Sequence, residues 1–175
     1  ECARAERYGF FFNLANTLRI RKIATAHTLD DQAETILMRI IKGSGHLGLS
    51  GIQPARFERG VELIRPLLYL PKEEILEYLH KKEMMYRIDT TNEDMSFTRN
   101  RIRLELIPYL EKSYNPNVKK ILANMAENIS EDYNFLEKIS ERYFEKSVIV
   151  EEDSVKIILQ EFNNLDRALQ KTIVR

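Results

Sequence analysis

The stretch TAHTLDDQAET, residues 25–35, concentrates groups that can do chemistry, because it holds three carboxylates and a histidine. In a helix that begins here, Asp31 and Glu34 are three residues apart, so both can reach the same external group. One interpretation is a capping box between Thr28 and Asp31, and a second is a divalent metal site completed by His27. A third is an acidic pair that receives an amine or a cation at the carboxyl end of a parallel strand. The residues alone leave all three interpretations open.

The segment RNRIR, residues 99–103, opens a predicted helix with three arginines. Arg99 and Arg103 lie one turn apart and can share a face, and the arginine fork suits phosphate groups. The equal alternative is a solvated face whose arginines pair with Asp94 or Glu105. The pattern therefore predicts either an anion-binding face or an ordinary exposed one.

A glycine-rich segment, KGSGHLGLSG at residues 42–51, follows a predicted helix, whereas a phosphate-binding loop precedes one. We therefore expect a flexible loop or a lid at this place. Arg65 comes directly after a predicted buried strand, so its side chain is expected to point into a cleft. Cys2 is the single cysteine, which excludes an internal disulfide or a Cys-x-x-Cys site and fits a reducing compartment.

Composition sets broad limits on the class of protein. The chain has 175 residues, of which 43% are hydrophobic and 31% charged, as is usual for globular proteins. Lysine and arginine total 27 and aspartate and glutamate total 27, which argues against a wholesale polybasic nucleic-acid binder but not against a local basic patch. No stretch approaches the roughly 20 apolar residues of a membrane span, so we expect a cytoplasmic protein with no membrane partner. The start lacks a methionine and reads like the middle of a helix, so we expect a piece of a longer protein.

Helices alternate with strands over the first part of the chain, which predicts a parallel α/β architecture. The expected helices lie at residues 2–18, 30–42, 71–82 and 99–112, and the expected extended segments at 22–26, 61–65 and 86–89. Two predicted buried stripes carry this pattern, namely Ala5, Tyr8, Phe12, Ala15 and Leu18, and then Ala33, Ile36, Leu37, Ile40 and Ile41. Only two or three strands are visible, so we expect part of a doubly wound parallel sheet.

The tripeptide NPN, residues 115–117, predicts a boundary between a domain at 1–114 and a smaller, mainly helical domain at 115–175. One long helix follows the boundary, about 30 residues or about 45 Å long. Its apolar residues keep a heptad spacing, at Val118, Leu122, Met125, Ile129, Leu136, Ile139 and Tyr143. A hairpin is expected around 151–153, with a last helix after it. The heptad helix can either pair with a second copy, giving a homodimer, or fold onto its own hairpin.

Taken together, these segments resemble the tRNA(Ile)-lysidine synthetase family over roughly residues 3–117. The motifs occur in that family's order: ARAERY, TAHTLDDQAETILMRIIKGSGHLGLSGI, IRPLL, EEILEYL, DTTNED, RNRIRLELIPYL and NP. The combination is specific, although no single motif is. The resemblance implies the adenine nucleotide alpha-hydrolase-like fold of the N-type ATP pyrophosphatases, the PP-loop superfamily. The family's Ser-Gly-Gly-x-Asp-Ser loop would lie upstream of Glu1, so we expect a fragment that cannot form lysidine by itself.

The resemblance implies a tRNA-modifying ligase. Such an enzyme uses ATP and Mg²⁺ to adenylate the C2 oxygen of the wobble cytidine in tRNA(Ile) with a CAU anticodon, and it releases pyrophosphate. The ε-amine of free L-lysine then attacks C2 and displaces AMP, which gives lysidine. The cytidine has to leave its stack to be reached.

The resemblance also implies roles for particular residues. Asp31 and Glu34 would place the lysine ammonium and help to remove its proton, and Arg65 completes the expected catalytic set. The expected nucleotide-binding residues are Arg4, His27 and Asp31. The expected tRNA-binding residues are Arg99, Asn100, Arg101 and Arg103. No dedicated metal ligand is assigned.

Three rival functions follow from the same features. A tRNA thiolase of the same superfamily commonly uses paired cysteines, and the single Cys2 argues against it. A non-catalytic RNA-binding fragment agrees with the heptad helix and with RNRIR. A metal hydrolase would use His27, Asp31 and Glu34 and would bind zinc stoichiometrically. Mutation of Asp31 and Glu34 in a full-length protein separates an enzyme, which loses turnover, from a binding module, which keeps its tRNA affinity.

Overall fold

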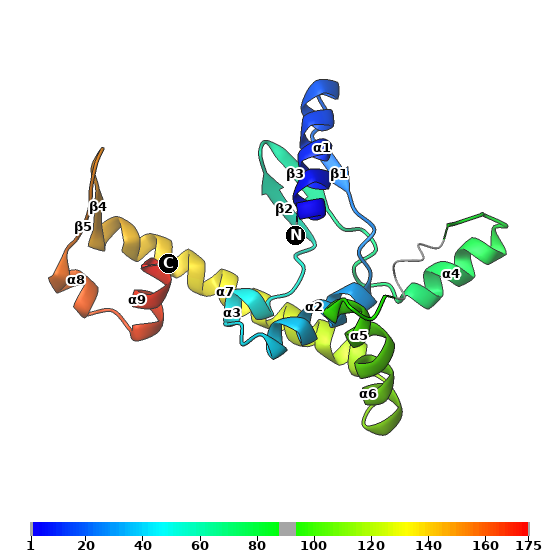
Figure 1. Ribbon diagram of the computed structural model, residues 1–175. Coiled ribbons are helices and arrows are strands. Elements are labelled where there is room, and N and C mark those ends of the chain that lie inside the picture. Colours follow the sequence, from blue (N-terminus) through cyan, green and yellow to red (C-terminus); the bar gives the residue numbers. More distant parts are fainter. Residues whose placement is uncertain (1, 88–93, 175) are drawn as a thin grey trace.

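The computed structural model, shown in Figure 1, describes residues 2–87 and 94–174. The helices are α1 (Cys2–Leu18), α2 (Leu29–Ile41), α3 (His46–Leu49), α4 (Lys72–Lys81), α5 (Thr98–Arg101), η2 (Ile102–Leu106), α6 (Ile107–Ser113), α7 (Val118–Ser147), α8 (Leu159–Asn163) and α9 (Arg167–Ile173). The strands are β1 (Lys22–Ala24), β2 (Ala55–Glu58), β3 (Val61–Ile64), β4 (Val148–Val150) and β5 (Val155–Ile157). Helix α7 forms a long axis, with α1 and the three-stranded sheet on one side and the β4–β5 hairpin at its end.

The three-stranded sheet confirms the predicted parallel pair and adds a strand to it. Strands β1 and β3 are parallel neighbours, with Ile23 opposite Leu63. Strand β2, which the sequence pattern did not reveal, pairs antiparallel with β3. Arg59 and Gly60 join these two strands with φ values of 50° and 79°, and positive φ at both residues is what the tight hairpin turns that match strand twist require. The sheet is therefore mixed, in the order β1-β3-β2.

Helix α1 covers one face of this sheet. Phe12 and Ala15 are buried together with Val61 and Leu63, two β3 residues that alternate onto the same face. This contact confirms the middle of the predicted α1 stripe. Leu18, which was expected in the stripe, is 57% exposed, because the helix ends at this residue and the chain turns away toward β1.

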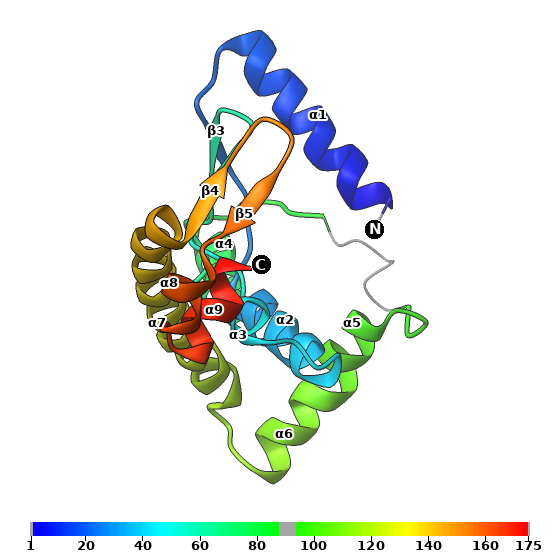
Figure 2. The same cartoon turned by 90° about the vertical axis from the view of Figure 1, so that its left-hand side faces the viewer.

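Helix α2 lies between α7 and the continuous helix formed by α5, η2 and α6, as Figure 2 shows. The buried residues of this core are Ala33, Ile36, Leu37, Ile102, Ile107, Leu122 and Ala126. The expectation that Ile40 and Ile41 are buried is wrong, because the packed cluster ends at Met38 and the last turn of α2 lies beyond its neighbours. The first half of α7 thus shares a core with α2, and the domain boundary after residue 114 stays a prediction.

The predicted helix at residues 99–112 is confirmed, and it contains a π-helical turn. It runs from Thr98 to Ser113 in three consecutive pieces, of which η2 is the wider middle one. Pro108 follows this turn, and because proline lacks an N–H and its ring crowds the preceding turn, it disturbs the regular α pattern there. Ile102 and Ile107 are buried in the core that this helix shares with α2.

The glycine-rich segment at residues 42–51, which was expected to be a flexible loop or a lid, contains a short helix. Four of its residues form α3, and the side chain of Arg39 donates hydrogen bonds to the carbonyl oxygens of Gly48 and Gly51. Because Arg39 belongs to the last turn of α2, these bonds hold the segment against the end of that helix.

The remaining elements agree with expectation in part. Helices α4, α7 and α9 and the β4–β5 hairpin lie where they were predicted, and α8 is an addition. Residues 86 and 87 form no strand, while 88–93, which hold most of the DTTNED motif, lie outside the described residues. Within the described part of the chain, no helix combines the length and the apolar character needed to cross a membrane.

Candidate active site

The start of α2 is a helix cap. Thr28 is the N-cap residue, and its hydroxyl accepts a hydrogen bond from the Asp31 N–H at 3.4 Å. Asp31 returns the contact, because its Oδ2 accepts from the Thr28 N–H at 2.9 Å and from the Thr28 hydroxyl at 3.0 Å. The predicted capping box is confirmed. Since the cap uses Oδ2, the Oδ1 atom of Asp31 is left for another partner.

That partner is an arginine 68 residues further along the chain. Nη2 of Arg99 donates to Asp31 Oδ1 at 2.9 Å, and Nε of Arg99 donates to Glu34 Oε2 at 2.7 Å. Arg103 donates to both oxygens of Glu34, from Nε at 2.6 Å and from Nη2 at 3.1 Å. We call these four residues the carboxylate–arginine lattice. One of the two alternatives for Arg99 and Arg103 was pairing with Asp94 or Glu105, and the structure instead pairs both arginines with the two acids of α2.

Burial separates the two acids of the lattice. The side chain of Glu34 is 1% exposed and that of Asp31 is 20% exposed, so the expectation that both point outward is wrong for Glu34. The cause is the α5–η2 helix, which lies over the outer face of α2. A buried carboxylate is costly unless it is paired, and three arginine N–H groups pair with Glu34. Burial by itself would lower the pKa of Arg103, but the hydrogen bonds and charge of Glu34 outweigh it and raise that pKa.

A cavity of about 430 Å³ opens beside the lattice, at the carboxyl end of β1. Its lining residues come from α1, the end of β1 and the segment after it, α2 and α5, and they are Arg7, Tyr8, Phe11, Ala24, Thr25, Ala26, His27, Asp31 and Arg99. One wall is aromatic and belongs to α1, another is charged and belongs to the lattice, and small side chains leave the space between them. A cavity of this kind can hold a flat ring against one wall and a charged group against the other.

The α1 wall was not predicted from the sequence. Arg7 and Phe11 are four residues apart, so they share a face of α1. The spacing of Arg7 and Phe11 could have indicated this second face of α1. The stripe through Tyr8 and Phe12, which the sequence pattern did reveal, is the one that packs in the core. His27, by contrast, lines the cavity as expected, and its Nδ1 lies 2.9 Å from the Thr25 hydroxyl. The nucleotide-binding role of His27 stays a prediction.

The polar side chains of the RNRIR segment lie in different environments. Arg99 and Arg103 turn toward α2, as described above. Asn100 is buried, and its amide donates to the carbonyl oxygen of Asp94 at 2.8 Å, at the end of the preceding loop. Arg101 is exposed, with one contact to the Thr98 hydroxyl at 3.4 Å. The predicted tRNA contacts of these residues remain predictions, and Arg101 is the arginine that faces solvent most freely.

Arg65 lies apart from the lattice cavity. It is 5% exposed, and its guanidinium donates to the carbonyl oxygen of Gln53 at 2.5 Å. Its backbone N–H donates to the carbonyl oxygen of Pro54 at 2.8 Å, so Arg65 fixes the segment that enters β2. The structure therefore does not bring Arg65 together with Asp31 and Glu34 in this cavity. Arg4 belongs to α1, and its side chain lies outside the described part of the structure.

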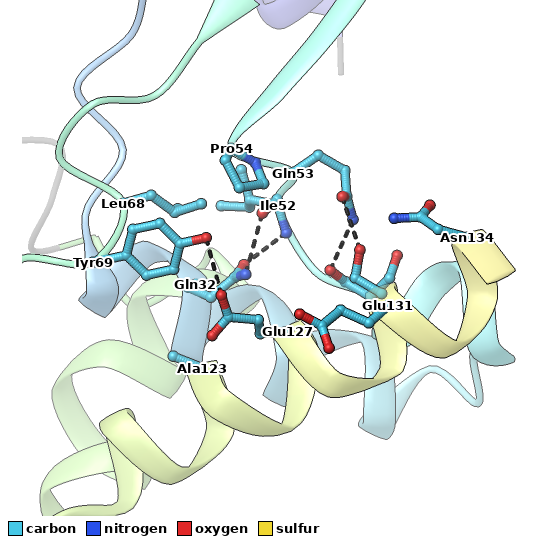
Figure 3. Close-up of a pocket in the computed structure, with 12 residues that line it drawn as sticks. Gln32, Ile52, Gln53, Pro54, Leu68, Tyr69, Ala123, Glu127, Glu131 and Asn134 are labelled. Atoms are coloured by element: carbon cyan, nitrogen blue, oxygen red, sulfur yellow. Dashed lines mark hydrogen bonds between the residues drawn. The ribbon is translucent and has the colours of Figure 1, made fainter.

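A second cavity, of about 210 Å³, lies between α7, the 50–54 segment and Tyr69, as Figure 3 shows. Gln32 of α2 exchanges hydrogen bonds with the backbone of Ile52, at 2.6 Å and 3.2 Å. The hydroxyl of Ser130 on α7 donates to the side-chain oxygen of Gln53 at 3.0 Å. These bonds hold the loop between α2 and α7, so this cavity belongs to the scaffold.

Metal-ligating side chains do not gather in the part of the chain that the structure describes. Among residues 2–87 and 94–174, no three histidine, cysteine, aspartate or glutamate side chains are placed so that they could hold one ion.

Comparison with known proteins identifies a domain family and several relatives. A family model described as a PP-loop domain matches residues 1–110. The chain is 41% identical over 174 residues to the bifunctional protein TilS/HprT of Listeria monocytogenes, covering 99% of this chain and 27% of that protein. It is 41% identical over 170 residues to a tRNA(Ile)-lysidine synthase of Clostridium perfringens, covering 97% of this chain and 36% of that protein. The chain thus spans between about a quarter and a little over a third of these relatives.

A solved structure supports the fold independently. The U34-tRNA thiolase NcsA from Methanococcus maripaludis, solved with its 4Fe-4S cluster, matches with a TM-score of 0.59 and 21% sequence identity. The match covers 75% of this chain and 44% of that one. At this level of identity the likeness shows the fold alone. With the domain match, it confirms the predicted α/β, adenine nucleotide alpha-hydrolase-like fold class.

Proposed function

Because this chain belongs to the PP-loop domain family, we propose that it carries part of the active site of a tRNA(Ile)-lysidine synthase. Relatives of that name are about 40% identical over nearly the whole chain, which supports the proposal. The observation that carries it is the carboxylate–arginine lattice, which meets a cavity at the carboxyl end of β1, where α/β sheets bind their ligands. In the proposed reaction, ATP adenylates the C2 oxygen of the wobble cytidine of tRNA(Ile), and the amine of lysine then displaces AMP.

Asp31 is the residue that we assign to the lysine ammonium. It is the lattice carboxylate that also lines the cavity, and a carboxylate oxygen accepts more than one hydrogen bond. Nucleophilic attack needs the amine in its neutral form, so the group that holds the ammonium is also placed to take its proton. Glu34 is buried and pairs with both arginines, and its proposed contribution is to keep Asp31 and Arg99 at fixed positions.

The nucleotide is assigned to the remaining walls of the same cavity. Tyr8 and Phe11 offer aromatic faces for a base, and Arg7 and Arg99 offer positive charge for phosphate oxygens. Mg²⁺ prefers one or two carboxylates together with substrate phosphates and water, and Asp31 supplies such a carboxylate at this place. When bound, the ion would neutralise charge on the phosphates during adenylation.

The RNA is assigned to exposed basic residues outside the lattice. Arg101 is exposed beside the lattice arginines, and α7 carries Lys138, Arg142 and Lys146 in exposed positions four residues apart. Residues at this spacing share one helix face, and lysine and arginine supply the sequence-independent part of RNA binding. We propose tRNA(Ile) with a CAU anticodon as the partner and the cytoplasm as the location.

A homodimer through α7 is a further part of this proposal. The C-terminal heptad positions Leu136, Ile139 and Tyr143 are half-buried or exposed, whereas Leu122 is used in the core with α2. A seam for a second copy is therefore restricted to the C-terminal half of α7. Sedimentation of the full-length protein measures this directly, and a monomer at micromolar concentration would exclude it.

The product of the full-length protein tests the proposed function. The protein is incubated with unmodified tRNA(Ile), ATP, Mg²⁺ and isotopically labelled lysine, and the digested nucleosides are separated by mass. We expect labelled lysidine that depends on ATP and on the cytidine at the wobble position. A thiolated nucleoside in a parallel incubation that also contains sulfide as a sulfur donor would support the thiolase alternative, and tRNA binding with no new nucleoside would support a non-catalytic RNA-binding protein. Either result contradicts the proposal.

A further inference from the structure

Lys119, in the first turn of α7, joins several elements beside the lattice. Its Nζ lies 3.0 Å from Asp30 Oδ1 and 3.2 Å from Glu111 Oε1. The other oxygen of Asp30 accepts a 2.7 Å hydrogen bond from the Lys72 N–H, at the start of α4. We call Lys119, Asp30, Glu111 and Lys72 the Lys119 cluster. It connects the first turns of α2, α4 and α7 with the last turn of α6.

The cluster is partly shielded from water. The side chains of Lys119 and Asp30 are 20% and 18% exposed. Burial would raise the pKa of Asp30, but the Lys72 N–H and the Lys119 ammonium outweigh it and hold that pKa below its ordinary value. Burial would likewise lower the pKa of Lys119, but hydrogen bonds to Asp30 and Glu111 raise it. Both groups are therefore charged at neutral pH, in an environment that screens them less than open solvent.

The cluster lies directly behind the candidate active site. Asp30 precedes Asp31 in the sequence, and both belong to the first turn of α2. A cavity of about 150 Å³ is bordered by the cluster residues Asp30 and Lys119 and also by the lattice residues Glu34 and Arg103. The Lys119 cluster and the carboxylate–arginine lattice thus border the same cavity. A movement of the first turn of α2 would change the contacts of both groups.

Helix capping does not account for Asp30. The cap of α2 is made by Thr28 and Asp31, and the two oxygens of Asp30 are used by α4 and α7 instead. These two contacts join α2 to other elements, in addition to the contact of the Asp30 carboxylate with its own backbone N–H. Asp30 therefore connects α2 to its neighbours.

We propose that Lys119 is a positioning residue: through Asp30, it fixes the first turn of α2, and hence Asp31, relative to α7. The proposal rests on the function proposed above, because Asp31 is the residue assigned to the lysine ammonium. Without the ammonium of Lys119, the carboxylates of Asp30 and Glu111 would repel each other across the position it held. The first turn of α2 would then move, and Asp31 would move with it.

Steady-state kinetics of the full-length protein test the proposal. In Lys119→Met, we expect the KM for lysine to rise on the order of tenfold, with kcat at saturating lysine changed by less than about threefold. The matched control is Lys120→Met, because Lys120 is the exposed neighbour on the same helix, and its KM should equal that of the wild type. In the double variant Lys119→Met with Asp30→Asn, the repulsion is absent, so the KM for lysine should fall back toward the wild-type value.

A second measurement separates failure of the inference from failure of the proposed function. Amide hydrogen exchange in residues 29–34 should be faster in Lys119→Met than in Lys120→Met, whether or not the protein forms lysidine. A wild type that forms no lysidine contradicts the proposed function alone. A lysine KM in Lys119→Met that equals the control or falls below it, or no rescue in the double variant, overturns the positioning role. Equal exchange in the two single variants also overturns it.

Discussion

Two groups of charges flank the first turn of α2, and they are built differently. In the carboxylate–arginine lattice, the guanidinium groups of two arginines donate hydrogen bonds to Glu34, which is 1% exposed. The lattice borders a cavity of about 430 Å³. In the Lys119 cluster, one ammonium pairs with the partly exposed acids Asp30 and Glu111 and lies 3.9 Å from the exposed Glu73, and the adjoining cavity is only about 150 Å³. Asp30 and Asp31 are neighbours in sequence, but successive helix residues point about 100° apart, so each joins a different group. The difference indicates that one group is suited to contact a ligand and the other to hold the helix.

The largest effect is expected where the lattice is most buried. Glu34→Gln leaves two arginines facing a neutral amide, so we expect the free energy of unfolding to fall by about 3 kcal/mol. Denaturant unfolding of the protein measures this change. Glu77→Gln is the control, because Glu77 pairs with Lys81 in an exposed position. A loss below about 1 kcal/mol in Glu34→Gln would mean that burial of the lattice acid is unimportant.

A smaller effect is expected from one arginine of the lattice. Arg99 bridges Asp31 and Glu34 through two different nitrogens, and a lysine cannot reproduce such a fork. Arg99→Lys should therefore lower the rate of lysidine formation about tenfold or more and destabilise the fold by about 1–2 kcal/mol. Arg101→Lys on the same helix is the control and should change the fold stability little. Equal stability losses in the two variants would argue against the bridging role.

Whether a contact in these two groups of charges could be predicted depends on how far apart its partners lie along the sequence. The capping box of Thr28 and Asp31 lies within one turn, and it was one of the three interpretations that the spacing offered. The partners of Arg99 lie more than 60 residues away, and no local period encodes that pairing. The burial of Glu34 could not be predicted for the same reason, because the covering helix belongs to a distant part of the chain.

The fold shows the same division between local and distant information. Helix α7 follows from its heptad spacing, and α2 follows from its cap. The β2–β3 hairpin was missed because its turn is Arg59-Gly60, and only the glycine is typical of such turns. The position of Arg65 was misjudged, because a residue at the end of a strand is expected to point into a cleft. Its guanidinium instead donates to the carbonyl oxygen of Gln53, in the segment that leads into β2.

The pH dependence of stability sharpens the view of the Lys119 cluster. The pKa of Asp30 is lowered in the folded state, chiefly by the Lys72 N–H and by Lys119 against the opposing effect of burial. A lowered pKa adds stability above the unfolded value and loses it as pH falls through the folded value. The unfolding free energy that Asp30→Asn removes should therefore be larger near about pH 6 than near about pH 3. Denaturant unfolding at both pH values measures this, and an equal loss at both would show that the charge of Asp30 contributes nothing.

The smallest effect is expected in the scaffold cavity. Ser130→Ala removes the hydroxyl that binds Gln53, a single neutral hydrogen bond worth about 0.5–1 kcal/mol. Denaturant unfolding should show this loss, and lysidine formation should change by less than about twofold. A loss of activity comparable to that of Arg99→Lys would mean that this cavity belongs to the active site after all.

The role of Asp31 is the most direct test of the proposed active site. The measurement is kcat/KM for lysine in lysidine formation by the full-length protein, at saturating ATP and tRNA(Ile), with Asp31→Asn compared with Glu77→Gln. Asparagine keeps an oxygen for the Thr28 cap but loses the charge that holds an ammonium. We predict a fall on the order of 100-fold in Asp31→Asn and no change in Glu77→Gln. A value for Asp31→Asn within about threefold of the wild type would contradict the assignment of Asp31 to the lysine ammonium.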